Sequence, residues 1–179
     1  MSRMQKVVRV TANLIVMAFV CVILALFIMP SYRQGEPFVS TKAEDFALML
    51  NGKSAHLSDL RGNVVVLNFW ASYCGSCVEE IPSLDRLQHR IAQRNGVVLA
   101  VSIDENPGAY RSFLANYPVG FPTYCSEGTK IVALHYSTSM IPETYVIDRK
   151  GYIIRKIIGP QQWDSGGMLE YFDAVLREN

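Results

Sequence analysis

A nearly continuous apolar run that leads into a pair of cysteines constrains this chain more than any other feature. The run is VVVLNFW at residues 64–70, and Cys74 and Cys77 follow it. Apolar residues without alternation over this length are typical of a strand buried on both faces. Residues 76–94 then carry apolar side chains at helical spacing. The sequence therefore predicts a C-x-x-C pair at the point where a buried strand turns into a helix.

The remaining elements predict an α/β fold. The Asn51-Gly52 pair between short apolar segments indicates a β-hairpin. Buried strands that alternate with helices predict an α/β sandwich whose sheet is parallel in its first half and antiparallel in its last. The further segments expected are strands at 97–103, 121–124, 143–148 and 152–158, and helices at 107–117, 129–136 and 166–178.

The position of the two cysteines indicates redox chemistry. Unpaired N–H groups and the helix dipole should stabilise a thiolate at Cys74, so its pKa should fall below the free value of about 8.5. Cys77 lies one helical turn further on the same face, placed to attack a mixed disulfide at Cys74. A structural bridge across two residues would constrain little of the unfolded chain. A zinc site would need two more ligands that no nearby motif offers, so we expect no metal and no cofactor.

Residues 7–29 form a long apolar segment with no charge after Arg9. As a helix they would span roughly 34 Å, against about 30 Å for a hydrocarbon core. Arg3, Lys6 and Arg9 precede the segment, so the positive-inside rule places the N-terminus in the cytoplasm. A cleaved signal peptide is the alternative, although the segment is longer than a usual signal core and no small-residue cleavage site follows.

These features predict three parts of the chain. Residues 1–30 are expected to form a cytoplasmic N-terminus and a single transmembrane signal anchor, and residues 31–43 a linker. Residues 44–179 should form the folded domain on the periplasmic or extracytoplasmic side of the inner (cytoplasmic) membrane. The net charge of +1, from 17 Lys+Arg and 16 Asp+Glu, argues against nucleic acid as a partner.

Two motifs carry a resemblance to a known family. WASYCGSCVEEIPSL, preceded by VVVLNFW, and MIPETYVIDRKGYI further along resemble the membrane-anchored thioredoxin-like proteins of the TlpA/ResA/CcmG (DsbE) type. The resemblance covers about residues 40–179. It implies a thioredoxin fold of four to five strands, extended by an N-terminal β-hairpin and by a central βα insertion within residues 104–136.

The resemblance also implies a substrate-binding surface. Ile141–Pro142 would be the cis peptide that faces the C-x-x-C pair, whereas the residues alone favour an ordinary trans bond. The backbone of Ile141 would then be free to pair with an extended substrate strand beside Cys74. Trp70 and Tyr73, adjacent to the motif, are expected to shape the substrate groove.

One acid is expected to take part in catalysis. Thioredoxins place a buried Asp where this chain has Asn68, and the ResA-like branch has a Glu at the position of Glu80. One turn beyond Cys77, Glu80 could accept that thiol's proton or hold its pKa up. The alternative is a solvated acid on the helix surface. Cys125 is expected to be an ordinary buried, unpaired cysteine, with a third redox thiol as the alternative.

Together these features predict a membrane-anchored thiol–disulfide oxidoreductase that reduces protein disulfides. The resemblance suggests the C-x-x-C-H cysteines of apocytochrome c as substrate, in cytochrome c maturation, and a CcdA/DsbD-like membrane protein as electron donor. A general periplasmic disulfide reductase or oxidase with other clients is one alternative. A non-catalytic thioredoxin-fold chaperone for a metal or an apoprotein is another.

Overall fold

The computed structural model describes residues 13, 16–20, 40–50, 52–125 and 128–178. The chain divides into two units, Met1–Phe38 and Val39–Asn179. In the first unit residues 13 and 16–20 are helical, and most of the membrane anchor expected at residues 7–29 lies outside the described residues. Among the residues that are described, no helix is both long enough and apolar enough to span a membrane.

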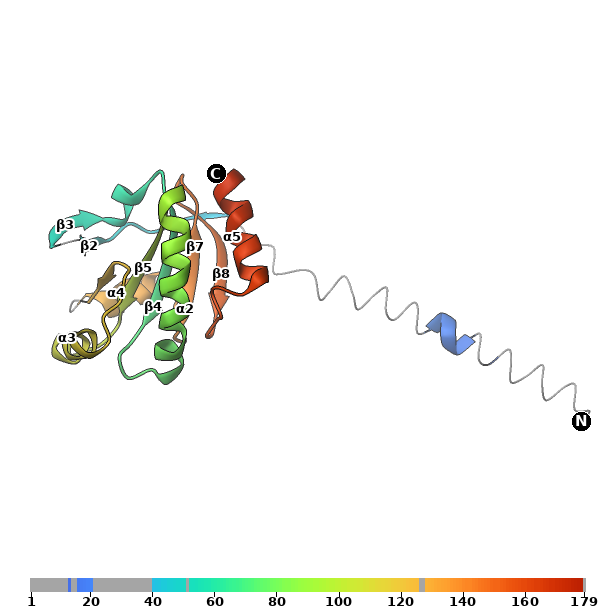
Figure 1. Cartoon of the computed structure of the whole chain (residues 1–179), viewed down its shortest axis with the longest axis horizontal. Helices are drawn as coiled ribbons and strands as arrows, with labels where there is room; N and C mark the ends of the chain where they lie inside the picture. The colour runs from blue at the N-terminus through green and yellow to red at the C-terminus, as the bar shows by residue number, and fades with distance from the viewer. Residues whose placement is uncertain (1–12, 14–15, 21–39, 51, 126–127, 179) are drawn as a thin grey trace, which may run out of the picture. The chain divides into compact units, whose positions relative to one another are not determined.

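A six-stranded sheet in the order β1-β8-β7-β4-β5-β6 forms the centre of the second unit (Figure 1). The central strand β4 runs parallel to β5, and β5 runs parallel to β6. On its other side β4 pairs antiparallel with β7, and β7 pairs antiparallel with β8. The expected change from parallel to antiparallel pairing is therefore confirmed. The strand bounds are β1 Thr41–Lys42, β4 Val64–Trp70, β5 Gly96–Ser102, β6 Thr123–Tyr124, β7 Glu143–Ile147 and β8 Tyr152–Ile158.

Helices α2 and α5 lie on the side of the sheet that faces the viewer in Figure 1. The long helix α2 spans Gly75–Ile91 and α5 spans Gly166–Glu178. The chain returns from α2 to β5 through the short helix η2, Ala92–Arg94. A Cβ at Gly96, the first residue of β5, would lie 2.7 Å from the Cβ of Ile91, so only glycine permits this close return.

The N-terminal hairpin forms where it was expected but does not join the main sheet. Its strands β2, Ala47–Leu50, and β3, Lys53–His56, make a separate two-stranded sheet, which the 3-10 helix η1, Leu57–Leu60, follows. Thr41 and Lys42, expected in the linker, instead form the edge strand β1 and pair with Ile153 and Tyr152 of β8.

The segment between the two halves of the sheet holds the expected insertion. It contains α3 (Pro107–Asn116), the two-residue strand β6 and α4 (Thr129–His135). Because β6 pairs with the free edge of β5, the insertion widens the sheet beyond the expected four to five strands. Asn106 caps α3 by accepting a 2.8 Å hydrogen bond from the backbone N–H of Gly108.

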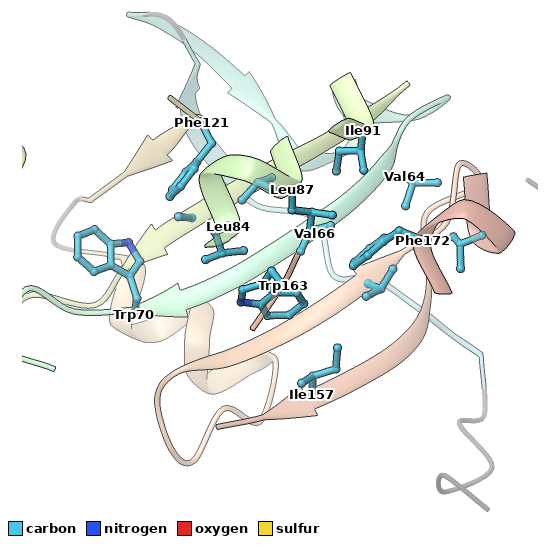
Figure 2. Packing of buried hydrophobic residues seen from close by; sticks show 14 of the residues in the cluster. Val64, Val66, Trp70, Leu84, Leu87, Ile91, Phe121, Ile157, Trp163 and Phe172 are labelled. Atoms are coloured by element: carbon cyan, nitrogen blue, oxygen red, sulfur yellow. The ribbon is translucent and has the colours of Figure 1, made fainter. Parts of the chain in front are cut away.

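The main core lies between the sheet and the two helices α2 and α5. Every residue of β4 is buried, as its apolar run predicts. Figure 2 shows Leu84 and Leu87 of α2 packed in the same cluster as Val66 and Trp163. A second, aromatic cluster forms where the ring of Tyr136 packs against Phe46, Phe69 and Tyr145. Burial on both sides holds β4 fixed, and β4 leads directly into the C-x-x-C pair.

Candidate active site

Cys74 and Cys77 lie at the first turn of α2 and are joined by a disulfide bond, with 5.3 Å between their Cα atoms. Cys74 is the N-cap residue, and its Sγ accepts a 3.2 Å hydrogen bond from the backbone N–H of Cys77. The hydroxyl of Ser76 lies 3.6 Å from the same sulfur. In the reduced protein these donors and the helix dipole favour the thiolate of Cys74.

The two cysteines differ in their exposure to solvent. Cys74 is partly exposed, whereas Cys77 retains 1% of its accessible surface. An incoming partner therefore reaches Cys74 first. Cys77 can meet only a group already bonded to Cys74. This asymmetry supports the predicted roles of Cys74 as nucleophile and Cys77 as resolving thiol.

The loop before β7 faces Cys74 from across the site. The Ile141–Pro142 peptide bond is cis, as the family resemblance implied. The carbonyl oxygen of Ile141 lies 3.9 Å from Sγ of Cys74. The carbonyl of Pro142 accepts a 2.9 Å hydrogen bond from the backbone N–H of Gly159, which ties the loop to the end of β8.

Three exposed apolar side chains come from the segments that meet at this site. Tyr73 precedes Cys74 and is 70% exposed, and Met140 precedes Ile141 and is 61% exposed. Ile158, next to Gly159, is 54% exposed. Exposed apolar groups around a reactive sulfur are suited to contact an unfolded or extended polypeptide.

Trp70 requires a correction, because it does not line a groove. Its side chain is 2% exposed, and its ring packs at 5.2 Å from Phe113 and 6.1 Å from Tyr110 of α3. As the last residue of a fully buried strand, Trp70 is covered by the helix of the insertion. It supports the active-site loop from behind, and Tyr73 is the aromatic residue that faces solvent.

Glu80 is buried rather than solvated, with 3% of its surface exposed. Its Oε1 accepts a 2.9 Å hydrogen bond from Nδ2 of Asn68. Its Oε2 accepts two more, each 3.0 Å long, from the backbone N–H of Gln161 and from Nε1 of Trp163. Burial raises the pKa of this carboxyl above its usual value, although the three hydrogen bonds act in the opposite direction. Glu79, by contrast, is exposed.

Glu80 and Asn68 stand out in the sequence, but the residues that complete this network do not. Asn68 also donates to Oγ1 of Thr144 on β7 at 2.9 Å. Trp163 is fully buried, and its backbone N–H donates to the hydroxyl of Ser83 on α2 at 3.1 Å. The one signal in the sequence for these additional residues was Trp163, a large apolar side chain within the polar segment between β8 and α5.

Cys125 is a free cysteine beyond β6. It is half-buried, and burial raises the pKa of its thiol above the usual value. Its Sγ lies 3.6 Å from the backbone oxygen of Asp104 and is placed to donate to it. These contacts agree with the expected ordinary cysteine.

Comparison with known proteins gives the same picture as the geometry. The AhpC/TSA family matches residues 39–156. The thiol-disulfide oxidoreductase ResA of a Bacillus cereus strain is 34% identical over 124 residues, which are 69% of this chain and 71% of that protein. The thioredoxin-like protein YneN of Bacillus subtilis is 34% identical over 115 residues, 63% of this chain and 66% of its own.

A solved structure described as a putative thiol:disulfide interchange protein DsbE from Chlorobium tepidum has the same fold. It superposes with a TM-score of 0.71 at 31% identity and covers 76% of this chain and 96% of its own. The residues that match the family include β4, the C-x-x-C pair and the loop with the cis proline. The chain thus belongs to the AhpC/TSA family and, within it, to the thioredoxin-like thiol–disulfide oxidoreductases of the TlpA/ResA/CcmG type.

Proposed function

We propose that this oxidoreductase works outside the cytoplasm as a reductant of protein disulfides, anchored to the cytoplasmic membrane by residues 7–29. Its proposed clients are cysteine pairs such as the C-x-x-C-H pair of apocytochrome c. One observation carries the exchange chemistry: an accessible Cys74 is paired with a buried Cys77 that has a buried carboxyl one helical turn away. The direction, reduction of the client, rests on the family resemblance.

The reaction proceeds in two exchanges. The thiolate of Cys74 attacks one sulfur of the client disulfide, forms a mixed disulfide, and releases the other client sulfur as a thiolate that takes up a proton. Cys77 then loses its proton and attacks Sγ of Cys74, so that the second client thiolate leaves. Two electrons pass to the client, and the protein is left with the Cys74–Cys77 disulfide.

Glu80 is the group best placed to accept the proton of Cys77. Ionisation of a thiol with 1% exposure is opposed by desolvation, so a nearby base is needed for the second exchange. Glu80 follows Cys77 by three residues on the same face of α2 and is held in place by Asn68 and Trp163. Its raised pKa brings the carboxyl closer to the working pH, which makes it a more effective base.

The client surface and the location are supported by separate features. The backbone of Ile141 beside Cys74 can pair with an extended client strand, and Tyr73, Met140 and Ile158 can contact its apolar side chains. The resemblance of the sequence motifs to the TlpA/ResA/CcmG type suggests a role in cytochrome c maturation, with a CcdA/DsbD-like membrane donor that restores the dithiol. Disulfides persist outside the cytoplasm, where a dedicated reductant has substrates.

Trapping of mixed disulfides tests the proposed function. In cells that make c-type cytochromes, Cys77→Ala should accumulate mixed disulfides because the resolving thiol is gone, whereas Cys74→Ala should accumulate few. Mass spectrometry of the trapped species should find C-x-x-C-H peptides bonded to Cys74. The reverse pattern would mean that the two cysteines have the opposite roles, and clients without such a pair would favour a general reductase.

Glu80→Gln should slow the resolving step without changing the first exchange. The variant removes the base, whose contribution is on the order of 10²–10⁴-fold in rate. Stopped-flow kinetics with a peptide disulfide should show normal formation of the mixed disulfide and its slow decay. In the unchanged protein the decay should slow as the pH falls through the raised pKa of Glu80, and the variant should lack this pH dependence.

The matched control is Glu79→Gln, which makes the same chemical change at an exposed position on the same turn. It should resolve mixed disulfides at the unchanged rate. Equal rates for both variants would show that Glu80 has only a structural role.

The proposed location has its own test. A reporter fused after residue 179 should be active only outside the cytoplasm, and the protein should remain in the membrane fraction after salt washing. Release of a soluble form that begins near residue 31 would instead identify a cleaved signal peptide.

A further inference from the structure

A second buried carboxylate, Asp104, lies behind the active-site loop on the side of Cys74. It follows β5 and is 4% exposed. Its Oδ2 accepts hydrogen bonds from the backbone N–H of Ser72 at 2.9 Å and from Oγ of Ser102 at 2.5 Å. Its Oδ1 accepts one from Oγ of Ser72 at 2.7 Å. The side-chain oxygens of Asp104 thus accept from three donors, as those of a carboxylate do. The backbone N–H of Asp104 donates in turn to Oγ of Ser102 at 3.0 Å.

The charge of Asp104 has no cationic partner among the ion pairs of the described residues. Its three donors are one neutral amide and two neutral hydroxyls. Such donors stabilise a buried carboxylate but leave its net charge in place. A negative charge in a poorly solvated position acts on its neighbours over a longer range than it would in water.

Asp104 is close to the nucleophile in space. Ser72, which donates to it twice, precedes Cys74 by two residues, and two residues span at most about 7 Å of extended chain. The loop is also held on both sides of Ser72. The backbone N–H of Ile103 donates to the oxygen of Trp70 at 2.8 Å, and that of Cys74 donates to the oxygen of Ala71 at 3.1 Å.

The charge of Asp104 also contributes to the pKa shifts of two neighbouring groups. The pKa of Tyr110 on α3 is raised mainly by burial, and the charge of Asp104 adds to the increase. The pKa of Cys125 is likewise raised mainly by burial, with a further increase from Asp104.

Other charged groups lie near the same part of the site. Arg111 is the cation that faces Cys125, and Glu80 is the acid on the side of Cys77. Lys130 near Tyr73 is paired with Glu105 at 2.6 Å.

We propose that Asp104 is a positioning residue that anchors Ser72 and whose uncompensated negative charge opposes ionisation of Cys74. The N–H of Cys77 and the helix dipole stabilise the Cys74 thiolate, and Asp104 acts against them from the other side of the loop. Because only the reduced state can hold a thiolate, this charge destabilises the dithiol form relative to the disulfide. The protein is thereby a stronger reductant than its C-x-x-C turn alone would make it. The inference deepens the proposed function and rests on it for its biological use.

Asp104→Asn tests the proposal, because it removes the charge and keeps an oxygen that can accept from Ser72. We expect the pH midpoint of iodoacetamide alkylation at Cys74, followed by mass spectrometry on the reduced full-length protein, to fall by about one pH unit. A shift of this size corresponds to a unit charge about 10 Å away at an effective dielectric constant of about 20. Ser72→Ala is the matched control, since it removes one hydrogen bond from the same carboxylate but leaves the charge, and its midpoint should stay near that of the unchanged protein.

The redox equilibrium with glutathione provides a readout that a purely structural role would not produce. Reduction of the Cys74–Cys77 disulfide consumes two glutathione thiols and yields one glutathione disulfide. Asp104→Asn should match the unchanged protein at a pH well below the pKa of Cys74. At higher pH its equilibrium constant for reduction should rise progressively, to about tenfold that of the unchanged protein. This corresponds to a reduction potential about 30 mV higher.

An unchanged alkylation midpoint, or a change in the equilibrium that is equal at every pH, would overturn the proposal. Should Asp104→Asn fail to fold by circular dichroism, Asp104→Ser carries the same expectation, and Asp104→Glu should keep the midpoint of the unchanged protein. Because glutathione replaces the client, a failed search for apocytochrome c clients would not affect this result. A failed Asp104 test would equally leave the trapping experiment standing.

Discussion

The arrangement of the site depends on the hydrogen bonds that the buried carboxyl of Glu80 accepts. Burial of a carboxylate without partners is strongly unfavourable, so its three hydrogen bonds are a condition for the fold as well as for the chemistry. Through Asn68 and Thr144 the network joins α2 to β4 and β7, and through Gln161 and Trp163 it joins α2 to the segment before α5. The resolving cysteine and its proposed base are therefore fixed by the same contacts that fix the helix on the sheet.

Two of the buried acids, Glu80 and Asp104, belong to the hydrogen-bond networks next to the C-x-x-C pair, and we propose that they act on different sulfurs. Glu80 lies on the Cys77 side, where a base speeds the loss of a proton from a buried thiol. Asp104 lies behind the loop on the Cys74 side, where a fixed negative charge weakens the thiolate. Glu80 affects the rate at which Cys77 resolves the mixed disulfide. Asp104 affects how strongly the dithiol drives reduction. The two effects can be separated experimentally, because they alter different steps.

The sequence predicted the framework of the fold because its signals are local. The apolar run of β4, the helical spacing of α2 and the cysteine spacing each lie within a few residues. The cis bond at Ile141–Pro142 was predictable only from the family resemblance, since the residues alone favour the trans form. The pairing of Thr41 and Lys42 with β8 joins residues more than a hundred positions apart, and two polar residues give no local sign of it.

The side-chain contacts of the site were harder to predict for the same reason. Burial of Glu80 depends on Trp163, which is 83 positions away, so the sequence left a solvated acid as an alternative. The burial of Trp70 depends on α3 of the insertion, and its position beside Cys74 suggested a groove instead. In the sequence Asp104 was recognisable only as the residue after a predicted strand. Its hydrogen bond with Ser72 depends on the parallel pairing of β4 with β5, which brings the ends of the two strands together.

The reduction potential of the Cys74–Cys77 couple tests the central claim, that this protein is a reductant, most directly. It can be measured on the full-length protein at pH 7 by equilibration with dithiothreitol and glutathione redox buffers, with the thiol state followed by alkylation and mass shift. We predict a potential below about −200 mV, in the range of proteins that reduce disulfides. A value near or above about −150 mV, toward that of strong oxidants, would contradict the claim and identify an oxidase.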